Sequence, residues 1–365
     1  MLKELYIHNY RRFSNTTLKF DSTILLAGKH GTGKTTVVEL INKIKQFILN
    51  KESIEVFSPI NNLSRWLKND FGESEIEFAL KYTADDKNIE YKYSLKLQIN
   101  LKENKYRICD EKLHCGGVLL YDFHIDQDER GIANVIADDK REFPYMIDWE
   151  RSGLTLASRI NSDIRYFMSE IKNKLHVFIL SLNGHQGNKE SSELDIYGGN
   201  FSQWFADMLT QKVIDIPTVL NSYSEFLSNF KEVYINRDTA EFTIKEGCES
   251  SNLFDIKFSE LSTGQKKLII YYAVFKFMPK GSCLIFDEFD NHLSPAELQP
   301  LYDLAQERQD DNDLQLIIVS HHHKTLNWYN KEAYIFYLDG MPAHIKIDDK
   351  PEDRERKLVS LIEGF

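Results

Sequence analysis

The chain has 365 residues, and its 56 Asp and Glu residues outnumber its 45 Lys and Arg residues, which gives a formal net charge of −11. This acidic balance excludes a strongly basic coat that would bind nucleic acid or a membrane surface, although it allows a local basic groove. Hydrophobic residues make up 42% of the chain, enough for a sizeable core, and no apolar run approaches the roughly 20 residues of a membrane span. The four cysteines are too few for a disulfide framework, so we expect a soluble, cytoplasmic globular protein with no membrane partner.

The N-terminal part predicts a β-hairpin, a buried strand, a glycine-rich turn and a helix, in that order. Leu5 and Ile7 alternate with polar residues and a second short run follows at 18–20, which favours the hairpin. The uninterrupted apolar run 23–27 is typical of a strand buried on both faces. Apolar residues then recur on one face of a helix, at Val37, Leu40, Ile41, Ile44 and Ile48.

The middle of the chain has a different pattern. Apolar and polar residues alternate from about 74 to 122, which predicts an antiparallel meander with one solvent-exposed face. Residues 124–150 are rich in carboxylates and predict an irregular surface loop in preference to a metal site. Residues 153–232 predict mostly helix, interrupted by a polar stretch at 183–200.

Strand and helix signals return in the last third of the chain. The expected elements are a helix at 264–278 that Pro279 stops, a strand at 283–286, a helix capped by Ser294 with Glu297 completing a capping box, a strand at 316–319, and a hairpin that turns at 339–340. Two segments with an α/β pattern thus flank a middle segment with a different pattern. We therefore expect an α/β protein whose core, residues 1–50 plus 255–365, is split by an antiparallel β lobe at 70–125 and a mostly helical insertion at 150–235.

The glycine-rich turn matches the phosphate-binding pattern G-x-x-x-x-G-K-[ST] and lies where the pattern requires, between a strand and a helix. Backbone N–H groups of such a loop surround phosphates, and the helix N-terminus adds partial positive charge. Lys34 is expected to reach the β- and γ-phosphates of ATP, and the Thr35 hydroxyl to bind Mg²⁺. A turn that binds nothing is the disfavoured alternative. The predicted ATP-binding residues here are Gly28, Lys29, His30, Gly31, Thr32, Gly33, Lys34, Thr35 and Thr36.

The apolar strand 283–286 runs directly into two acids, Asp287 and Glu288. This is the Walker B arrangement, in which Asp287 is expected to face Mg²⁺ and Glu288 to act as the catalytic group that polarises an attacking water. A second acid directly after the metal-facing one favours a hydrolase over a kinase.

Residues 261–265, Leu-Ser-Thr-Gly-Gln, match the signature LSxGQ and precede the two acids. Ser262, Gly264 and Gln265 stand at a predicted helix N-terminus, where a hydroxyl and backbone amides can donate to a γ-phosphate presented by another protomer. His321 directly follows the predicted strand 316–319, and we expect it to contact the γ-phosphate as a second catalytic residue. Two further histidines follow it, so which of His321, His322 and His323 has this role stays open, as does a solvated or metal-binding histidine run.

At these motifs the chain resembles the ABC-type ATPases, and among them the non-transporter branch that includes the RecF, SMC and OLD-like AAA ATPases. Segment 2–20 resembles the starting hairpin of that branch, and 286–295 resembles its Walker B with D-loop. The resemblance implies an ABC-type P-loop core that binds ATP and Mg²⁺. It also implies a head-to-head homodimer around ATP, with the P-loop of one protomer facing the signature of the other and Asp290, Asn291 and His292 lining the seam. The chain departs from the family near 71–77, where no clear Q-loop glutamine occurs.

No sustained heptad run occurs between the two halves of the core, which argues against an SMC-type coiled coil. We therefore expect an ATP-hydrolysing switch whose dimer regulates a separate effector protein, and family analogy suggests a toxin-type or anti-phage defence system. Three alternatives stay open: a DNA-maintenance ATPase and, with less support, a transporter ATPase subunit or a binding scaffold that holds ATP without turnover. The DNA-binding alternative needs a local basic patch, for which the candidates are Lys43, Lys45, Lys51, Lys172 and Lys174.

Overall fold

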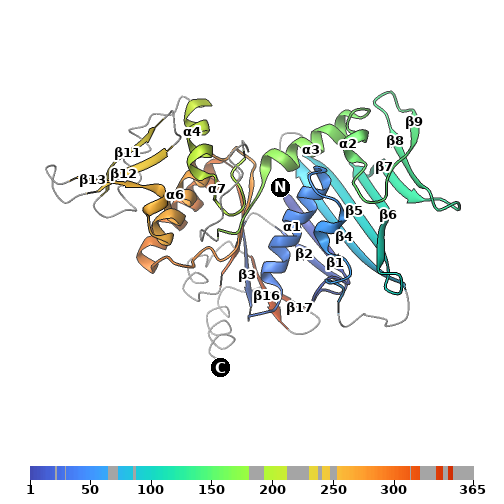
Figure 1. Ribbon diagram of the computed structural model, residues 1–365, viewed down its shortest axis with the longest axis horizontal. Helices are drawn as coiled ribbons and strands as arrows, with labels where there is room; N and C mark the ends of the chain where they lie inside the picture. Colours follow the sequence, from blue (N-terminus) through green and yellow to red (C-terminus); the bar gives the residue numbers. More distant parts are fainter. Residues whose placement is uncertain are drawn as a thin grey trace.

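The computed structural model describes residues 1–20, 23–28, 30–64, 73–84, 88–180, 193–211, 230–236, 241–246, 253–312, 314–320, 334–339 and 344–347. Helix α1 (Lys34–Ile48) lies between two β-sheets, and a second group of helices covers the far face of the smaller of these sheets (Figure 1). A three-stranded antiparallel sheet lies beyond those helices.

The smaller of the two sheets beside α1 has six strands and contains the predicted parallel core. Its strands, in spatial order, are β10 (Leu175–Phe178), β14 (Cys283–Phe286), β15 (Gln315–Val319), β3 (Thr23–Gly28), β16 (Tyr334–Asp339) and β17 (His344–Ile347). The first five are parallel, and β17 pairs with β16 in the antiparallel direction. The predictions of the three central strands and of the final hairpin are confirmed.

This sheet separates two hydrophobic cores, because successive side chains of its parallel strands point to opposite faces. In β3, Ile24 and Leu26 contact the core around α1, whereas Leu25 and Ala27 contact the core on the other face. The strands β14 and β15 divide their side chains in the same way. Burial on both faces explains why these strands are uninterrupted apolar runs in the sequence.

The larger sheet has eight strands that are all antiparallel to their neighbours. In spatial order they are β2 (Thr16–Lys19), β1 (Leu2–His8), β4 (Glu73–Ala84), β5 (Ile89–Asn100), β6 (Lys105–Cys115), β7 (Val118–Ile125), β8 (Gly131–Ile136) and β9 (Glu142–Met146). The predicted hairpin and meander are confirmed. The prediction of an irregular loop at 124–150 is wrong, because β8 and β9 extend the meander; β9 is mostly exposed and therefore shows no apolar alternation.

Helices pack on both faces of the six-stranded sheet. The other helices of the described residues are α2 (Leu154–Ala157), α3 (Ser162–Lys174), α4 (Phe201–Gln211), α6 (Thr263–Phe277) and α7 (Pro295–Asn312), with short 3₁₀ turns at Ile54–Phe57 and Phe258–Glu260. The short helix α2 contacts α3. The predicted capping box of α7 is present, since the Glu297 carboxylate accepts from Ser294 N at 2.7 Å and the Ser294 hydroxyl accepts from Glu297 N at 3.4 Å. No helix in the described ranges is both long and apolar enough to cross a membrane.

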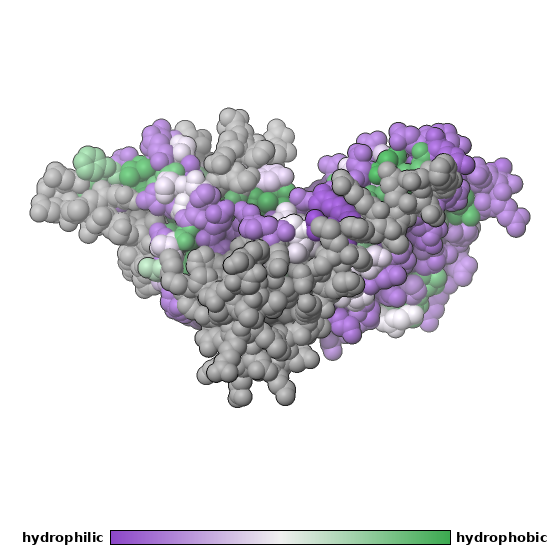
Figure 2. Space-filling view, turned by 90° about the horizontal axis from the view of Figure 1, so that it is seen from below, coloured by the Kyte–Doolittle hydropathy of each residue, from purple (hydrophilic) through white to green (hydrophobic). Residues whose placement is uncertain are grey.

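The expectation of a mostly helical segment at 150–235 is only partly right. It holds for α2, α3 and α4, but β10 follows α3 without a break and joins the core sheet. The three-stranded sheet begins inside this range, with β11 (Phe230–Asn236), β12 (Glu241–Glu246) and β13 (Phe254–Lys257). On the face seen in Figure 2, hydrophilic residues predominate over the described surface of the lobe that carries the eight-stranded sheet.

Candidate functional site

The sheet topology brings three predicted motifs to one edge. Strands β3, β15 and β14 are adjacent and parallel, with Leu26 opposite Val319 and Ile318 opposite Phe286. Their carboxyl ends therefore lie at the same level, where α/β proteins commonly bind ligands. The phosphate loop follows β3, the two acids follow β14, and the segment that begins at Ser320 follows β15.

The phosphate loop is shaped by its glycines and by the turn of the N-terminal hairpin. Gly33 has a left-handed backbone, with φ of 108°, and a Cβ there would lie 2.8 Å from the Phe13 ring, which is fully buried. Only glycine allows both this conformation and this close approach. The guanidinium of Arg12 also lies beside the loop, 3.6 Å from an ideal Cβ on Gly31. The hairpin thus holds the loop and places a cation beside it.

Lys34 opens α1 and turns back over the loop. Its side chain is buried, and Nζ donates a 2.6 Å hydrogen bond to the carbonyl oxygen of Gly28. Burial lowers the pKa of Lys34 to about 8, and the nearby carboxylate of Asp287 opposes this shift. A pKa of about 8 leaves most of the population protonated at neutral pH, so Lys34 retains the charge that phosphate binding requires.

Asp287 and Thr35, the two predicted metal ligands, are neighbours. The backbone N–H of Asp287 donates to Phe178 O of β10 at 2.9 Å, and its carboxylate accepts a hydrogen bond from the Thr35 hydroxyl. Its Oδ1 atom is buried and has no hydrogen-bond partner within the described part of the chain, and burial raises the pKa of this carboxyl. A buried carboxylate oxygen beside a hydroxyl suits a hard cation such as Mg²⁺, which prefers oxygen ligands. The residues therefore fit the expected metal.

Glu288, the predicted catalytic acid, is exposed and stands in a left-handed turn with φ of 49°. Such a conformation costs a non-glycine residue about 1–3 kcal/mol and persists only where the surroundings impose it. Asn291 Nδ2 donates to the Glu288 carboxylate at 2.9 Å, and Asn291 N donates to its carbonyl at 3.2 Å. Lys267 Nζ donates to the same carbonyl at 3.2 Å. These contacts hold the acid at the strand end.

The signature residues cap α6. The Ser262 hydroxyl accepts from Gln265 N at 3.2 Å, and the Gln265 side chain accepts from Ser262 N at 3.0 Å. This capping box leaves the hydrogen of the exposed Ser262 hydroxyl available as a donor. Gly264 touches the turn after β14, since a Cβ on it would lie 2.7 Å from His292 O. The signature is thus in contact with the turn that carries Glu288.

Several predicted residues have other placements or fall outside the described ranges. His30 is exposed, Thr32 is buried, and the Thr36 hydroxyl accepts from the Arg11 guanidinium at 3.2 Å. Lys29, His321, His322, His323 and the first two residues of the expected Q-loop region lie outside the described residues.

Sequence reasoning missed three neighbours of the site. Arg12 and Phe13 belong to a hairpin turn whose basic and aromatic residues were the available signal. Lys267 directly precedes the apolar run 268–275, and this position was the available signal of its burial.

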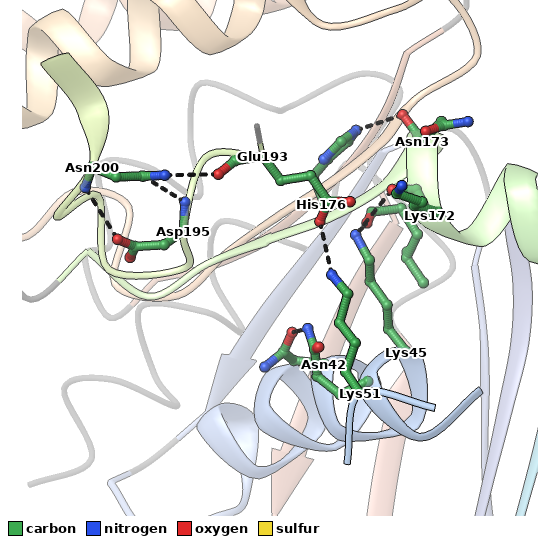
Figure 3. A network of polar contacts seen from close by, with 11 residues as sticks. Asn42, Lys45, Lys51, Lys172, Asn173, His176, Glu193, Asp195 and Asn200 are labelled. Atoms are coloured by element: carbon green, nitrogen blue, oxygen red, sulfur yellow. Dashed lines mark hydrogen bonds and ion pairs between the residues drawn. The ribbon is translucent and has the colours of Figure 1, made fainter. Parts of the chain in front are cut away.

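The far end of α1 is tied to α3 and β10 by a polar network (Figure 3). Lys45 Nζ donates to Leu175 O at 2.6 Å and to Lys172 O at 3.2 Å, so its ammonium group caps the C-terminal end of α3. Burial lowers the pKa of Lys45 to about 8. Lys51 forms an ion pair with Glu193 at 3.3 Å, which joins the end of α1 to the segment before α4. Helix α1, which starts at the phosphate loop, is thereby linked to β10. Strand β10 pairs with β14, the strand that Asp287 directly follows.

Fold and site together define a P-loop protein of the AAA class. The family model described as "AAA domain, putative AbiEii toxin, Type IV TA system" matches residues 24–327, and the chain therefore belongs to this family. The resemblance to the RecF, SMC and OLD-like AAA branch is confirmed. A comparison with curated protein sequences finds no match.

Three solved structures match this chain at low sequence identity, and one of them has a TM-score above 0.5. An SMC head bound to the C-terminal winged-helix domain of ScpA has a TM-score of 0.55 and 13% identity, with 95% of this chain and 97% of that chain covered. The SMC head domain from Thermotoga maritima has a TM-score of 0.45 and 13% identity, with 96% and 99% covered. An SMC head with an extended coiled coil, bound to the C-terminal domain of ScpA derived from Pyrococcus furiosus, has a TM-score of 0.49 and 11% identity, with 99% of both chains covered. The first of these supports an SMC-head-like fold for this chain, and the predicted fold class is confirmed.

Proposed function

We propose that the protein hydrolyses ATP with Mg²⁺ and acts as a molecular switch that regulates a separate effector protein. The observation that carries this proposal is the meeting of four groups at one sheet edge: the buried Lys34, the pair formed by Thr35 and Asp287, and the turn that presents Glu288. A binding protein without turnover would need the first three groups but not the fourth.

Each group has a distinct role in the proposed reaction. Lys34 and the loop amides bind the phosphates, and Thr35 with Asp287 would hold Mg²⁺, whose charge neutralises phosphate oxygens when it is bound. The Glu288 carboxylate takes a proton from a water whose oxygen attacks the γ-phosphorus. The bond from that phosphorus to the bridging oxygen of ADP breaks, which releases ADP and phosphate.

We further propose that two protomers share each nucleotide. The exposed Ser262 hydroxyl retains a hydrogen to donate, and it stands at the start of a 15-residue helix whose N-terminus favours negative charge. The fold relative with a TM-score of 0.55 is an SMC head bound to a domain of another protein, ScpA. That arrangement supports, by analogy, a partner protein for this chain, and the toxin–antitoxin description of the family supports a role in defence.

DNA binding is the second candidate, but the lysine patch on which it would depend is weakened by the structure. Lys45 is 5% exposed and its ammonium group is directed to backbone carbonyls. Lys51 pairs with Glu193, and Lys174 pairs with Glu170 at 3.2 Å. These lysines therefore do not present a free cationic surface.

The direct test of ATP hydrolysis is phosphate release from ATP by the purified protein with Mg²⁺, compared with Glu288→Gln. The substitution removes the base but keeps the size of the side chain, so turnover should fall about 10²–10⁴-fold. Nucleotide binding should survive, whereas Lys34→Ala should weaken it. A Glu288→Gln protein that hydrolyses ATP at the normal rate would show that the base is elsewhere.

The shared site is tested by mixing two inactive variants. Lys34→Ala damages the site of its own protomer, and Ser262→Arg places bulk and charge in the site of the partner. A mixed dimer combines one doubly damaged site with one intact site, so the mixture should regain part of the ATPase activity. Association with ATP is measured in the same samples by sedimentation. If unmutated protein stays monomeric with ATP and the mixture stays inactive, the shared-site proposal is wrong.

A further inference from the structure

Lys267 is a buried cation that the proposed chemistry does not use. It lies in α6, is 1% exposed, and donates through Nζ to the backbone carbonyl of Glu288 at 3.2 Å. Burial lowers its pKa, and the carboxylates of Glu288, Asp290 and Asp287 oppose that shift. Because a buried ammonium group is unfavourable unless it is paired, this position needs the carbonyl and the surrounding acids.

The helix contacts the turn after β14 along one face. Gly264 lies against His292 O, with 2.7 Å from an ideal Cβ to that oxygen. One turn further on is Lys267, and the ring of Tyr271 then stacks on Phe289 with 4.5 Å between centroids. Residues spaced by three and four share a helix face, so these contacts form one continuous surface. The turn that carries the acid therefore rests on the helix that begins at the signature.

We propose that Lys267 is a positioning residue that couples the signature helix to Glu288 of the same protomer. The inference rests on the proposed function, because it assigns Glu288 the role of base. When the partner's nucleotide engages Ser262, a displacement of α6 is transmitted through Lys267 to the Glu288 carbonyl. Each protomer would thus orient its own base according to whether its signature is occupied, without Lys267 touching nucleotide.

The first test compares steady-state rates of variants at one helix position. Lys267→Met keeps the length of the side chain but removes the charge and the donor, so kcat should fall about 10–100-fold. KM for ATP should change less than about threefold, because the phosphate loop is untouched. Lys267→Arg keeps a charged donor and should recover part of kcat. Lys276→Met, the same change in the last turn of α6, is the matched control and should leave kcat unchanged.

The second test asks whether Lys267 acts through Glu288. In a Glu288→Gln background, Lys267→Met should lower the residual rate by less than about twofold, since groups that act as a unit are not additive. If the two losses multiply, Lys267 acts independently of Glu288 and the inference is wrong.

The third test does not depend on activity. Amide hydrogen exchange in residues 287–293 of nucleotide-free protein should become about tenfold faster in Lys267→Met and stay unchanged in Lys276→Met. Asn291 N and Leu293 N, which donate within this turn, are the reporters. If Lys267→Met does not fold, Lys267→Gln, which is neutral and shorter, replaces it. Unchanged hydrogen exchange in Lys267→Met would overturn the inference, even if the unmutated protein hydrolyses ATP. Faster exchange in Lys267→Met, together with no ATPase activity in the unmutated protein, would support the coupling between α6 and the turn but refute the proposed function.

Discussion

Replacing Gly264 with alanine adds one methyl group where α6 meets the turn after β14. A Cβ at this position lies 2.7 Å from the carbonyl oxygen of His292, which is backbone and cannot rotate away. Ordinary van der Waals contact begins at 3.4 Å, so the helix and the turn must separate by about 0.7 Å, the difference between 3.4 and 2.7 Å. The structure therefore predicts a displaced turn.

The variant should nevertheless fold, because two contributions to the free energy of unfolding have opposite signs. Alanine is favoured over glycine within a helix by up to about 1 kcal/mol, while overpacking costs about 1–3 kcal/mol. The net loss is then about 0–3 kcal/mol. Urea unfolding of Gly264→Ala beside the unmutated protein measures this difference.

Activity should respond much more strongly than stability. The displaced turn carries Glu288, and a misplacement of a catalytic group by about 1 Å lowers the rate by up to about 10²-fold. We expect kcat in a phosphate-release assay to fall by about 10–100-fold, with KM for ATP little changed because the phosphate loop is held by Phe13. A folded Gly264→Ala protein with unmutated kcat would show that this contact does not set the position of the base.

Three other substitutions test separate parts of the structure. Arg12→Ala should raise KM for ATP about tenfold with a smaller change in kcat, because its guanidinium lies 3.6 Å from an ideal Cβ on Gly31, and an unchanged KM in an ATP titration would exclude this role. The pKa of Lys45 is about 8 in the folded protein, against an ordinary value of 10.5. Between these two pH values the unfolded chain binds more protons than the folded chain, so the free energy of unfolding rises with pH by at most about 1.4 kcal/mol per pH unit. Lys45→Met should remove this rise in urea unfolding at pH 8 to 9.5, and an identical pH slope in both proteins would contradict it. Glu111 is buried and accepts hydrogen bonds from two tyrosine hydroxyls, a serine hydroxyl and a backbone N–H. Glu111→Gln should therefore destabilise the protein by about 2–4 kcal/mol while kcat stays the same, and an unchanged urea midpoint would show that the hydrogen bonds are replaced.

Sequence reasoning succeeded where the structure depends on local signals. The strands β3, β14 and β15 are buried on both faces and are therefore apolar throughout, and short motifs at their ends mark the loops that follow. It failed at β10 and β9 for physical reasons. Four residues are too few to show a period, and β10 is a strand because its backbone pairs with β14. The edge strand β9 is exposed and depends on pairing with β8.

The motif residues were predictable, but the contacts that orient them were not. The pattern around Ser262 predicts a signature, and the structure has the helix cap there, yet the approach of Gly264 to His292 joins segments that are distant along the chain. Lys267 is a similar case, since its sequence neighbours indicate a core helix while its charge suggests the surface. The hydrogen bond to the Glu288 carbonyl and the three carboxylates near it explain why a lysine is buried there.

Three different segments therefore support three different groups of the site. The hairpin turn with Phe13 packs on the phosphate loop, the backbone of β10 accepts from Asp287 N, and α6 holds the Glu288 carbonyl through Lys267. Because each support acts on one group, damage to each should affect a different step. Loss of the hairpin contact should weaken nucleotide binding, loss of β10 pairing should disturb the metal-facing acid, and loss of the α6 contact should slow turnover. An effector that bound any one of these segments would thus control a single step of the cycle, which is the property that a regulated switch requires.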